Sequence, residues 1–395
     1  MRGMKKQPKL IIGIAPDSFK GTLTALEAAE CIETGLKQAL KHLVVRKIPM
    51  ADGGEGTVQT IVEATGGKIH KRRVSGPLGR PAQAFWGMTG DGHTAVIEMA
   101  CASGLALLKS SEYNPLKTST RGTGELICAA LDKGARKILI GIGGSATNDG
   151  GMGMARALGV RFLDARGKEL PEGGGALEKL ESIDIRGLDQ RICKTVVEVA
   201  CDVDNPLTGK RGAAAVYGPQ KGASPEMVRQ LDNGLKNFAR VIKRDLGISI
   251  GRVPGAGAAG GLGGGLMAFL GGELRPGVDI VMDAVQLRRR LKDCRLVITG
   301  EGRMDGQTVN GKTPSGVART AVALGIPVVA IAGCLGDDVY HVRSIGIDAY
   351  FSTQKHNVTE EELPKIGAAA LVECAEQVGR LLGLGSALAV SGRHH

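Results

Sequence analysis

Short apolar runs recur along this chain, and several of them end where a glycine stands beside a charged residue. The runs at 9–15 and 44–50 flank a segment whose apolar residues have helical spacing, which predicts a strand–helix–strand opening. Towards the C-terminus, the runs at 294–300, 327–333 and 349–353 again alternate with helix-like segments, the last of them at 360–382. This alternation predicts parallel strands connected by helices, an α/β fold.

The middle of the chain has a different pattern. From about residue 67, apolar and polar residues alternate and are interrupted by GPLG and GDG, which predicts antiparallel hairpins. Glycine-rich loops then separate short elements up to about residue 285, among them predicted strands at 136–143 and 196–200 and a predicted helix at 225–246. We therefore predict one α/β domain made of both chain ends, 1–66 and 287–395, with a second, α+β domain inserted at 67–286.

Charge and cysteine content narrow the class of protein. The net charge of +11 is spread along the chain, aromatic residues are few and no nucleic-acid recognition motif is present, so we expect no nucleic-acid partner. The eight cysteines form no CxxC pair, which favours free thiols in a reducing compartment. Because no apolar stretch is long enough to span a membrane, we expect a cytoplasmic protein without a membrane partner.

Three short patterns imitate nucleotide-binding motifs. Residues 306–313 (GQTVNGKT) fit the P-loop pattern, but the preceding strand is predicted to end near Gly300 and Pro314 follows at once. Residues 141–146 (GIGGSA) and 255–260 (GAGAAG) fit dinucleotide-binding patterns, but neither lies in a clear strand–turn–helix context. With 61 glycines in 395 residues, such matches arise by chance, and we interpret all three as accidental.

Loops with a charge beside glycine follow at least five of the predicted strands. The segments are APDSFKGTLTA (15–25), MADGGEGT (50–57), KTSTRGTGEL (117–126), GGSATNDGG (143–151), CDVDNPLTG (201–209), YGPQKGA (217–223) and TGEGRMDGQT (299–308). Open α/β sheets bind ligands at the carboxyl ends of their strands. Carboxylates there suit Mg²⁺ binding or proton abstraction, and bare glycine amides suit anions.

These segments, together with AVIEMACASGLAL, NPLKTSTRGTGEL, IGIGGSATNDGG, PGAGAAGGLGGGL, LRPGVDIVMD and GK.P (311–314), resemble the signature blocks of the type-1 glycerate kinases. The resemblance runs in order from about residue 10 to 380. The sequence departs from the pattern at Gly306, where serine is expected, and at Gly21, where a larger residue is common. The Gly306 change creates the apparent P-loop.

The resemblance implies ATP-dependent, Mg²⁺-assisted phosphorylation of D-glycerate to 2-phosphoglycerate, with 3-phosphoglycerate not excluded. It also implies a flavodoxin- or Rossmann-like parallel-sheet domain with an inserted mixed-sheet domain, and an active site in the cleft between them. ATP and Mg²⁺ are then the cofactors and D-glycerate the substrate, and a homodimer is compatible with this assignment.

Roles for individual residues follow as hypotheses. Asp202 is the first candidate for the base, Asp52 the second, and Lys20 is placed to neutralise phosphate charge. The candidates for binding glycerate are Asp17, Ser18, Arg303, Ser119 and Thr120. The candidates for ATP and phosphate are Gly143, Gly144, Ser145, Asn148, Lys221, Gly257, Gly260 and Lys312. Mg²⁺ would be held by carboxylates among Asp52, Asp204 and Glu301.

Two other functions stay open on the sequence alone. An NAD(P)-dependent oxidoreductase of a small hydroxy acid would use the GIGGSA segment, although its context argues against this. A non-catalytic carboxylate-binding protein would need fewer carboxylates than the strand ends supply.

Overall fold

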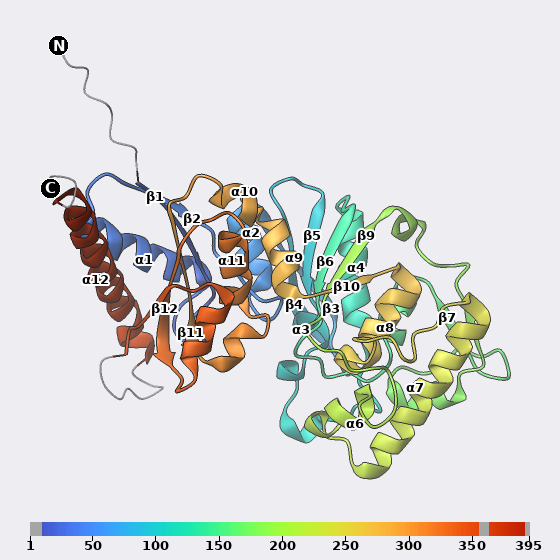
Figure 1. The fold of residues 1–395 in the computed structure, drawn as a ribbon. Helices are drawn as coiled ribbons and strands as arrows, with labels where there is room; N and C mark the ends of the chain where they lie inside the picture. The colour runs from blue at the N-terminus through green and yellow to red at the C-terminus, as the bar shows by residue number, and fades with distance from the viewer. Residues whose placement is uncertain (1–9, 355–362, 392–395) are drawn as a thin grey trace. The chain divides into compact units, whose positions relative to one another are not determined.

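The computed structural model describes residues 10–354 and 363–391, and its contacts divide them between two compact units (Figure 1). Unit 1 comprises residues 1–52 and 281–395, and unit 2 comprises residues 53–280. Both boundaries fall earlier in the chain than the sequence predicted. The first one differs because α2 (Thr57–Thr65) packs on strands of unit 2, which the hydrophobic pattern of the helix could not reveal.

Unit 1 contains a five-stranded sheet with helices before or after each strand. Its elements are β1 (Leu10–Pro16), α1 (Ala25–Ala39), β2 (Leu43–Lys47), α10 (Leu287–Leu291), β11 (Leu296–Met304), the 3-10 helix η6 (Gly306–Val309), α11 (Thr313–Val322), β12 (Val328–Leu335), the 3-10 helix η7 (Val339–Ile345), β13 (Ala349–Ser352) and α12 (Leu363–Ser391).

The sheet of unit 1 is parallel throughout, in the order β13-β12-β11-β1-β2. Numbered along the chain within the unit, this is the order 2-1-3-4-5, which is the flavodoxin-like arrangement. The prediction of a flavodoxin-like domain built from both chain ends is therefore confirmed. In this topology the strand order reverses between β1 and β11, and the carboxyl ends of these two strands mark the expected ligand site.

The helices α1 and α12 lie against each other in unit 1 and close one hydrophobic cluster with the sheet. A capping box at Thr24 and Glu27 starts α1, and buried Ala28, Ile32 and Leu36 line its inner face. A side chain at Gly35 would meet the carbonyl oxygen of Val372 in α12 at 2.1 Å, so only glycine permits this close approach.

Unit 2 is larger and is built around a six-stranded sheet. Its elements are α2, β3 (Lys68–Ser75), β4 (Pro81–Met88), β5 (Thr94–Glu98), α3 (Ala100–Ser103), η1 (Leu105–Leu107), η2 (Ser110–Glu112), α4 (Arg121–Asp132), β6 (Lys137–Gly141), α5 (Met152–Ala157), β7 (Arg161–Leu163), η3 (Gly174–Lys179), β8 (Ser182–Asp184), η4 (Gln190–Lys194), β9 (Val196–Ala200), α6 (Ala213–Tyr217), η5 (Pro219–Lys221), α7 (Pro225–Leu246), α8 (Ala258–Leu270), β10 (Glu273–Arg275) and the first half of α9 (Gly277–Ala284).

The sheet of unit 2 is mixed, in the order β10-β9-β6-β5-β4-β3. Strands β3, β4 and β5 pair antiparallel, as the alternating pattern predicted, and β5, β6, β9 and β10 are parallel. The prediction of a mixed-sheet α+β unit is confirmed. The carboxyl ends of β5, β6 and β9 meet at one edge, where the loops beginning at residues 99, 142 and 201 start.

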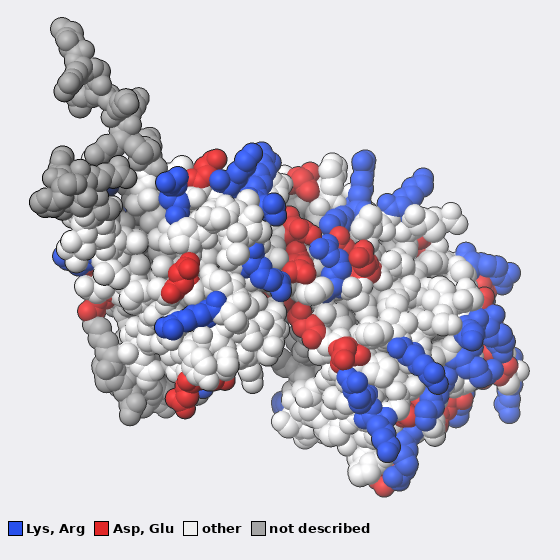
Figure 2. Space-filling model, viewed as in Figure 1, with Lys and Arg blue, Asp and Glu red and all other residues white. Residues whose placement is uncertain are grey.

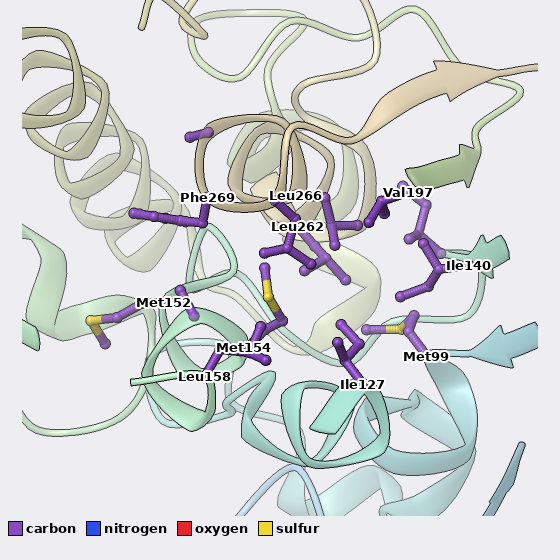
Figure 3. Packing of buried hydrophobic residues seen from close by; sticks show 14 of the residues in the cluster. Met99, Ile127, Ile140, Met152, Met154, Leu158, Val197, Leu262, Leu266 and Phe269 are labelled. Carbon is purple, nitrogen blue, oxygen red and sulfur yellow. The ribbon is translucent and has the colours of Figure 1, made fainter. Parts of the chain in front are cut away.

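Apolar side chains from helices and sheet converge in the core of unit 2 (Figure 3). Ile140 of β6 and Val197 of β9 face Ile127 of α4, Met154 of α5 and Leu262 of α8. This core fixes the strands from which the polar loops emerge.

Some element limits differ from those that the sequence predicted. The strand expected at 294–300 continues to Met304, because Arg303 and Met304 still pair with β12. The helix expected at 360–382 extends to Ser391, and its expected start at 360–362 lies outside the described residues. Within residues 10–354 and 363–391, no helix has the length and apolarity that crossing a membrane requires.

Candidate functional site

The carboxyl ends of β1 and β11 carry a group of acidic side chains in unit 1. Asp17 and Ser18 follow β1, while Glu301 lies in the last part of β11 and Asp305 directly after it. The two strands are neighbours, with Ala15 paired to Thr299 and Pro16 to Gly300. The topology therefore brings together the first and fourth fifths of the chain at the predicted ligand edge.

The carboxylate of Asp17 is held by two donors. Oδ1 accepts a hydrogen bond from the N–H of Ser18 (2.6 Å), and Oδ2 accepts one from the hydroxyl of Thr313 (2.5 Å), the first residue of α11. Burial raises the pKa of Asp17 to about 6 against the effect of these hydrogen bonds, and the negative field of Asp52 adds to the increase. Asp17 and Asp52 thus lie close enough to repel each other.

Glu301 is only 8% exposed and has a similar environment. Its Oε1 accepts a hydrogen bond from the hydroxyl of Thr308 (2.7 Å), and its Oε2 lies 3.9 Å from Nζ of Lys312. Burial raises the pKa of Glu301 to about 7; Thr308 and Lys312 oppose this increase, and the charges of Asp17 and Asp305 add to it. A cation brought to this edge would relieve the repulsion among these carboxylates.

The predicted cations of unit 1 differ in their availability. Lys20 is exposed, and no ion pair involves it in the described parts of the chain. Arg303 is exposed but pairs through Nε with Oδ2 of Asp305 (3.2 Å). Lys312 is half-buried, and its Nζ lies 3.9 Å from Oδ1 of Asp305 as well as from Glu301.

The strand and helix that flank residues 306–313 resemble those of a P-loop more than the sequence predicted. Because β11 continues to Met304 and α11 begins at Thr313, the predicted end of the strand near Gly300 is wrong. However, the N–H of Gly306 donates to Asp338 (2.9 Å) and that of Gln307 to Asp305 (3.0 Å). Two amides that a P-loop would aim at phosphate are thus bonded to carboxylates of the chain itself.

In unit 2, the loop after β6 presents a bare stretch of backbone. Gly143 and Gly144 are exposed, and Gly144 has a positive φ of 71°. A Cβ at Gly143 would meet no atom within 4 Å, and the amides of these two glycines form no hydrogen bond with the residues described. The carbonyl of Gly144 accepts from Leu105, and the N–H of Ala146 donates to Ser103, which anchors the loop on α3 and η1. Such a fixed, open backbone suits an anion.

Behind this stretch lie three further predicted residues, all of them buried. Ser145 is 8% exposed and Lys221 is 1% exposed, and Nζ of Lys221 donates to Oγ of Ser145 (2.7 Å). Asn148 is fully buried, and neither Oδ1 nor Nδ2 has a hydrogen-bond partner among the described residues. Of this predicted set, the two glycines are therefore the ones that solvent reaches.

Ser119 and Thr120, predicted to bind glycerate, are buried in a network around Asp149. Oδ2 of Asp149 accepts from both the N–H and the hydroxyl of Thr120 (2.9 Å each), and the same hydroxyl accepts from the N–H of Met154. The hydroxyl of Ser119 donates to Glu172 (2.5 Å). The hydroxyl of Thr120 thus ties the start of α4 to α5, and that of Ser119 is bonded to Glu172. Direct binding of a substrate by these two hydroxyls stays a prediction.

Gly257 and Gly260 pack against neighbouring backbone. The N–H of Gly257 donates to the carbonyl of Asn205 (3.0 Å), and a Cβ at Gly260 would lie 1.9 Å from the carbonyl oxygen of Thr147. Gly260 also has a positive φ of 69°. Their contacts explain why glycine is needed there without any ligand, and the predicted phosphate role of both stays a prediction.

The segment after β9 carries the two remaining carboxylates. Asp202 is exposed, and its Oδ1 accepts a hydrogen bond from the N–H of Gly277 (2.9 Å). Asp204 is exposed as well and forms an ion pair with Nη2 of Arg211 (2.8 Å). Asp202 is thereby oriented by a backbone amide, whereas Asp204 is paired with the exposed side chain of Arg211.

Several residues that take part in these sites were not among the predicted ones. Thr308 and Thr313 bind Glu301 and Asp17, and both lie within the GQTVNGKT segment that we interpreted as accidental. Asp149 is fully buried among backbone donors, and Glu98 accepts from the N–H of Val58 (2.8 Å) at the start of α2. The available signal was the same in each case: a lone polar residue beside a buried strand or a glycine.

Within the described residues, no three side chains of His, Cys, Asp or Glu form a metal-binding group.

On the face drawn in Figure 2, Lys and Arg side chains gather over α10. There, Arg288, Arg289 and Lys292 border a hollow of about 550 Å³, which contains none of the predicted site residues.

The sequence model of the glycerate kinase family matches residues 12–383. A glycerate kinase of Bacillus subtilis (strain 168) is 57% identical over 339 residues, which cover 86% of this chain and 89% of the relative. A glycerate 2-kinase of Escherichia coli (strain K12) is 54% identical over 341 residues, covering 86% of this chain and 90% of the relative.

A solved structure agrees with these sequence matches. A crystal structure described as a candidate glycerate kinase 2 from Salmonella typhimurium LT2 superimposes with a TM-score of 0.90 at 50% identity. The match covers 96% of this chain and all of the other chain. The similarity therefore extends over both units.

Proposed function

Since this chain belongs to the glycerate kinase family, we propose that it transfers the terminal phosphoryl group of ATP to the 2-hydroxyl of D-glycerate. The observation that carries the proposal is the family match over residues 12–383, joined to 54% identity with a relative named glycerate 2-kinase. A kinase of this family uses ATP as phosphoryl donor and glycerate as acceptor. The choice of the D-isomer and of the 2-hydroxyl belongs to the proposal.

A carboxylate must accept the proton of the attacking hydroxyl. We assign this role first to Asp202 and second to Asp52, as the sequence predicted. The hydrogen bond from the N–H of Gly277 fixes one oxygen of Asp202, which favours a defined orientation of the carboxylate. General-base catalysis of this kind contributes about 10²–10⁴-fold to a rate.

The carboxylates at the edge of β1 and β11 support a second role, in charge handling. The charge of Asp52 raises the pKa of Asp17, and the charge of Asp17 raises that of Glu301, so this group of carboxylates suits a divalent cation. Mg²⁺ in kinases is held by one or two carboxylates together with substrate phosphates, so a dedicated cage of three protein ligands is not required. When bound, Mg²⁺ would neutralise phosphate charge. We assign its binding to Asp52 and Glu301, because the charges of both act on Asp17 or are acted on by it at this edge of the sheet.

Cations and backbone amides supply the other phosphate contacts. We assign Lys20 and Lys312 in unit 1 to phosphate charge, and the bare amides of Gly143 and Gly144 in unit 2 to a phosphate oxygen. Arg303, exposed at the end of β11, can present its guanidinium fork to the carboxylate of glycerate after leaving Asp305. The location of the active site in a cleft between two domains, and a homodimeric state, stay predictions.

Phosphorus NMR of the product tests the activity and the position of the phosphate together. The enzyme is incubated with ATP, Mg²⁺ and D-glycerate. In 2-phosphoglycerate the phosphorus couples to one proton across the ester oxygen, and in 3-phosphoglycerate it couples to two. We expect a doublet; a triplet would refute the 2-position, and no new phosphate ester would refute the kinase.

Single substitutions test the assignment of the base. We expect Asp202→Asn and Asp52→Asn each to lower kcat by about 10²-fold or more, because each removes a carboxylate from the reaction. Asp132→Asn, an exposed aspartate at the end of α4 with two arginine partners, is the matched control and should retain kcat. Near-normal kcat in both active-site variants would refute the assignment.

A further inference from the structure

Lys221 is the one lysine among the buried polar residues of the described chain. It ends the 3-10 helix η5, and its side chain is almost completely covered. Lysine is very rarely buried in this way unless it is paired. Its Nζ donates to Oγ of Ser145 (2.7 Å) and to the carbonyl oxygen of Thr147 (2.7 Å), both of which are neutral acceptors. The amine therefore holds the loop after β6 from its buried side, with no acidic residue among its hydrogen-bond partners in the described part of the chain.

The amine of Lys221 is close to the midpoint of its titration at neutral pH. Burial lowers the pKa of Lys221 to about 7, and the field of Asp149 opposes this decrease. Asp149 belongs to the same loop as Ser145 and Thr147, and its oxygens are bonded to Thr120, Gly151 and Gly153. At neutral pH the amine can thus gain or lose a proton at little cost in free energy.

The two acceptors of Lys221 lie next to the open backbone of the loop. Ser145 directly follows the exposed Gly143 and Gly144, whose N–H groups have no partner in the described structure. Asn148, one residue after Thr147, has two buried polar atoms without partners, and buried polar groups almost always have one. Both observations indicate that the loop is complete only when a polar molecule is bound.

We propose that Lys221 is a positioning residue that holds Ser145 and the Gly143–Gly144 backbone in a shape that receives a phosphate group of the nucleotide, and that it takes up a proton when this group binds. A phosphate dianion close to the loop favours the charged form of the amine, so the complex binds more protons than the free enzyme. This inference rests on the proposed kinase function, but it concerns a residue that acts through Ser145 rather than on the reacting atoms.

Calorimetry of ADP binding in excess Mg²⁺, repeated in buffers of different ionisation enthalpy, measures the number of protons taken up per molecule of ADP bound. At pH 7 the free amine is about half protonated, so we expect an uptake of about 0.5 proton per site that depends on Lys221. At pH 5.5 this contribution should vanish, because the amine is already protonated. Asp17 and Glu301 would release protons when a cation binds, so the decisive quantity is the difference between wild type and Lys221→Met.

A surface variant controls for the loss of a lysine charge, and a second measurement replaces Lys221→Met if that variant does not fold. Lys236→Met, on the exposed side of α7, should show the proton count of the wild type. If Lys221→Met does not fold, the wild-type dissociation constant for ADP decides, measured without a divalent cation so that Asp17 and Glu301 release no proton to one. We then expect it to rise tenfold or more from pH 6 to pH 9, about one factor of ten for each unit by which binding raises the pKa of the amine.

Two outcomes would overturn the inference. One is an equal proton count in wild type and Lys221→Met at pH 7, and the other is an ADP affinity that does not depend on pH when no divalent cation is present. A purely structural lysine would lower thermal stability when replaced but would leave the proton count unchanged. Because the NMR assay of the product does not depend on proton uptake, failure of this inference is distinguishable from failure of the kinase assignment.

Discussion

Replacing Glu301 by glutamine is expected to stabilise the protein at alkaline pH while it impairs catalysis. Glu301 is 8% exposed, and burial raises its pKa from 4.5 to about 7. The folded state therefore binds this proton more tightly than the unfolded state does. The contribution of Glu301 to the free energy of unfolding is therefore greatest below about pH 4.5. It decreases as the pH rises from about 4.5 through about 7, where the buried carboxyl becomes ionised.

The size of the effect follows from the shift in pKa. A difference of roughly 2.5 units corresponds to about 3 kcal/mol at about 1.4 kcal/mol per unit. Glutamine retains an oxygen that accepts from the hydroxyl of Thr308, so the hydrogen bond survives and the ionisation is removed. We expect Glu301→Gln to be up to about 3 kcal/mol more stable than wild type above pH 7, with almost no difference at pH 4.5.

Urea unfolding at a series of pH values measures this difference, with kinase activity followed in parallel. Glu376→Gln on α12 is the matched control, because its carboxylate forms an i,i+4 ion pair with the exposed Arg380, and such surface pairs contribute little to stability. Its stability relative to wild type should vary little with pH. In Glu301→Gln we expect lower kcat/KM for ATP, because a carboxylate proposed to hold Mg²⁺ has been neutralised.

The reasoning would be refuted by a flat difference between Glu301→Gln and wild type from pH 4.5 to 8.5. A variant that is less stable than wild type at pH 8 would also contradict it, since the carboxylate would then contribute favourable bonds that outweigh its desolvation. Full activity of the variant would refute its proposed role but not the pKa argument.

Three other substitutions have definite expected outcomes. Thr313→Val removes a hydrogen-bond donor to the carboxylate of Asp17, and a hydrogen bond to a charged group is worth roughly 1.5–3 kcal/mol. The acidic limb of the pH profile of kcat/KM should therefore move to higher pH by about 1 to 2 units. An unmoved limb would contradict the role of Asp17. Phe238→Ala removes a ring packed against two other phenylalanines in the core of unit 2. We expect denaturant unfolding to show a free energy of unfolding lower by about 3–5 kcal/mol. A decrease below about 1 kcal/mol would contradict this packing. Gly260→Ala places a Cβ at 1.9 Å from the carbonyl of Thr147 at a positive φ, so a large loss of melting temperature is expected, and a neutral effect would mean that this loop can move.

Much of the fold could be predicted because it depends on short-range patterns. Apolar runs of five to eight residues indicated β1, β6, β9, β11 and β12, and the alternation of residues 67–98 indicated the antiparallel strands. The helix expected at 225–246 has those limits in the structure, since Ser224 caps it and Gly247 ends it in a left-handed conformation. These signals act within one element and need no knowledge of its neighbours.

The limits of elements were less predictable where distant partners decide them. β11 continues past Gly300 because β12 offers further pairing at Cys334 and Leu335, and no residue within β11 itself reports this. Similarly, α2 belongs to unit 2 because of the strands on which it packs. A strand end or a domain boundary is set by the element alongside, which lies far away in the sequence.

The candidate site shows the same division. Asp17, Glu301, Lys221 and Ser145 were recognised from their types and their places beside strands and glycines. Their burial and pairing were not: Thr308 and Thr313 bind the carboxylates, and Lys221 lies behind Ser145 instead of at the surface. Residue type indicates which chemistry is available, whereas exposure and partners decide whether a group binds a ligand or supports one that does.

The sequence by itself therefore determined the family, the α/β class and the set of loops that carry the chemistry, because ordered signature blocks and hydrophobic periodicity are local properties of the chain. Only the tertiary structure decided which carboxylates share a site, which amides stay open and how far each pKa is shifted. Those properties depend on desolvation and on distances between residues such as Asp17 and Glu301, which lie in distant segments of the chain and are brought together by the 2-1-3-4-5 strand order.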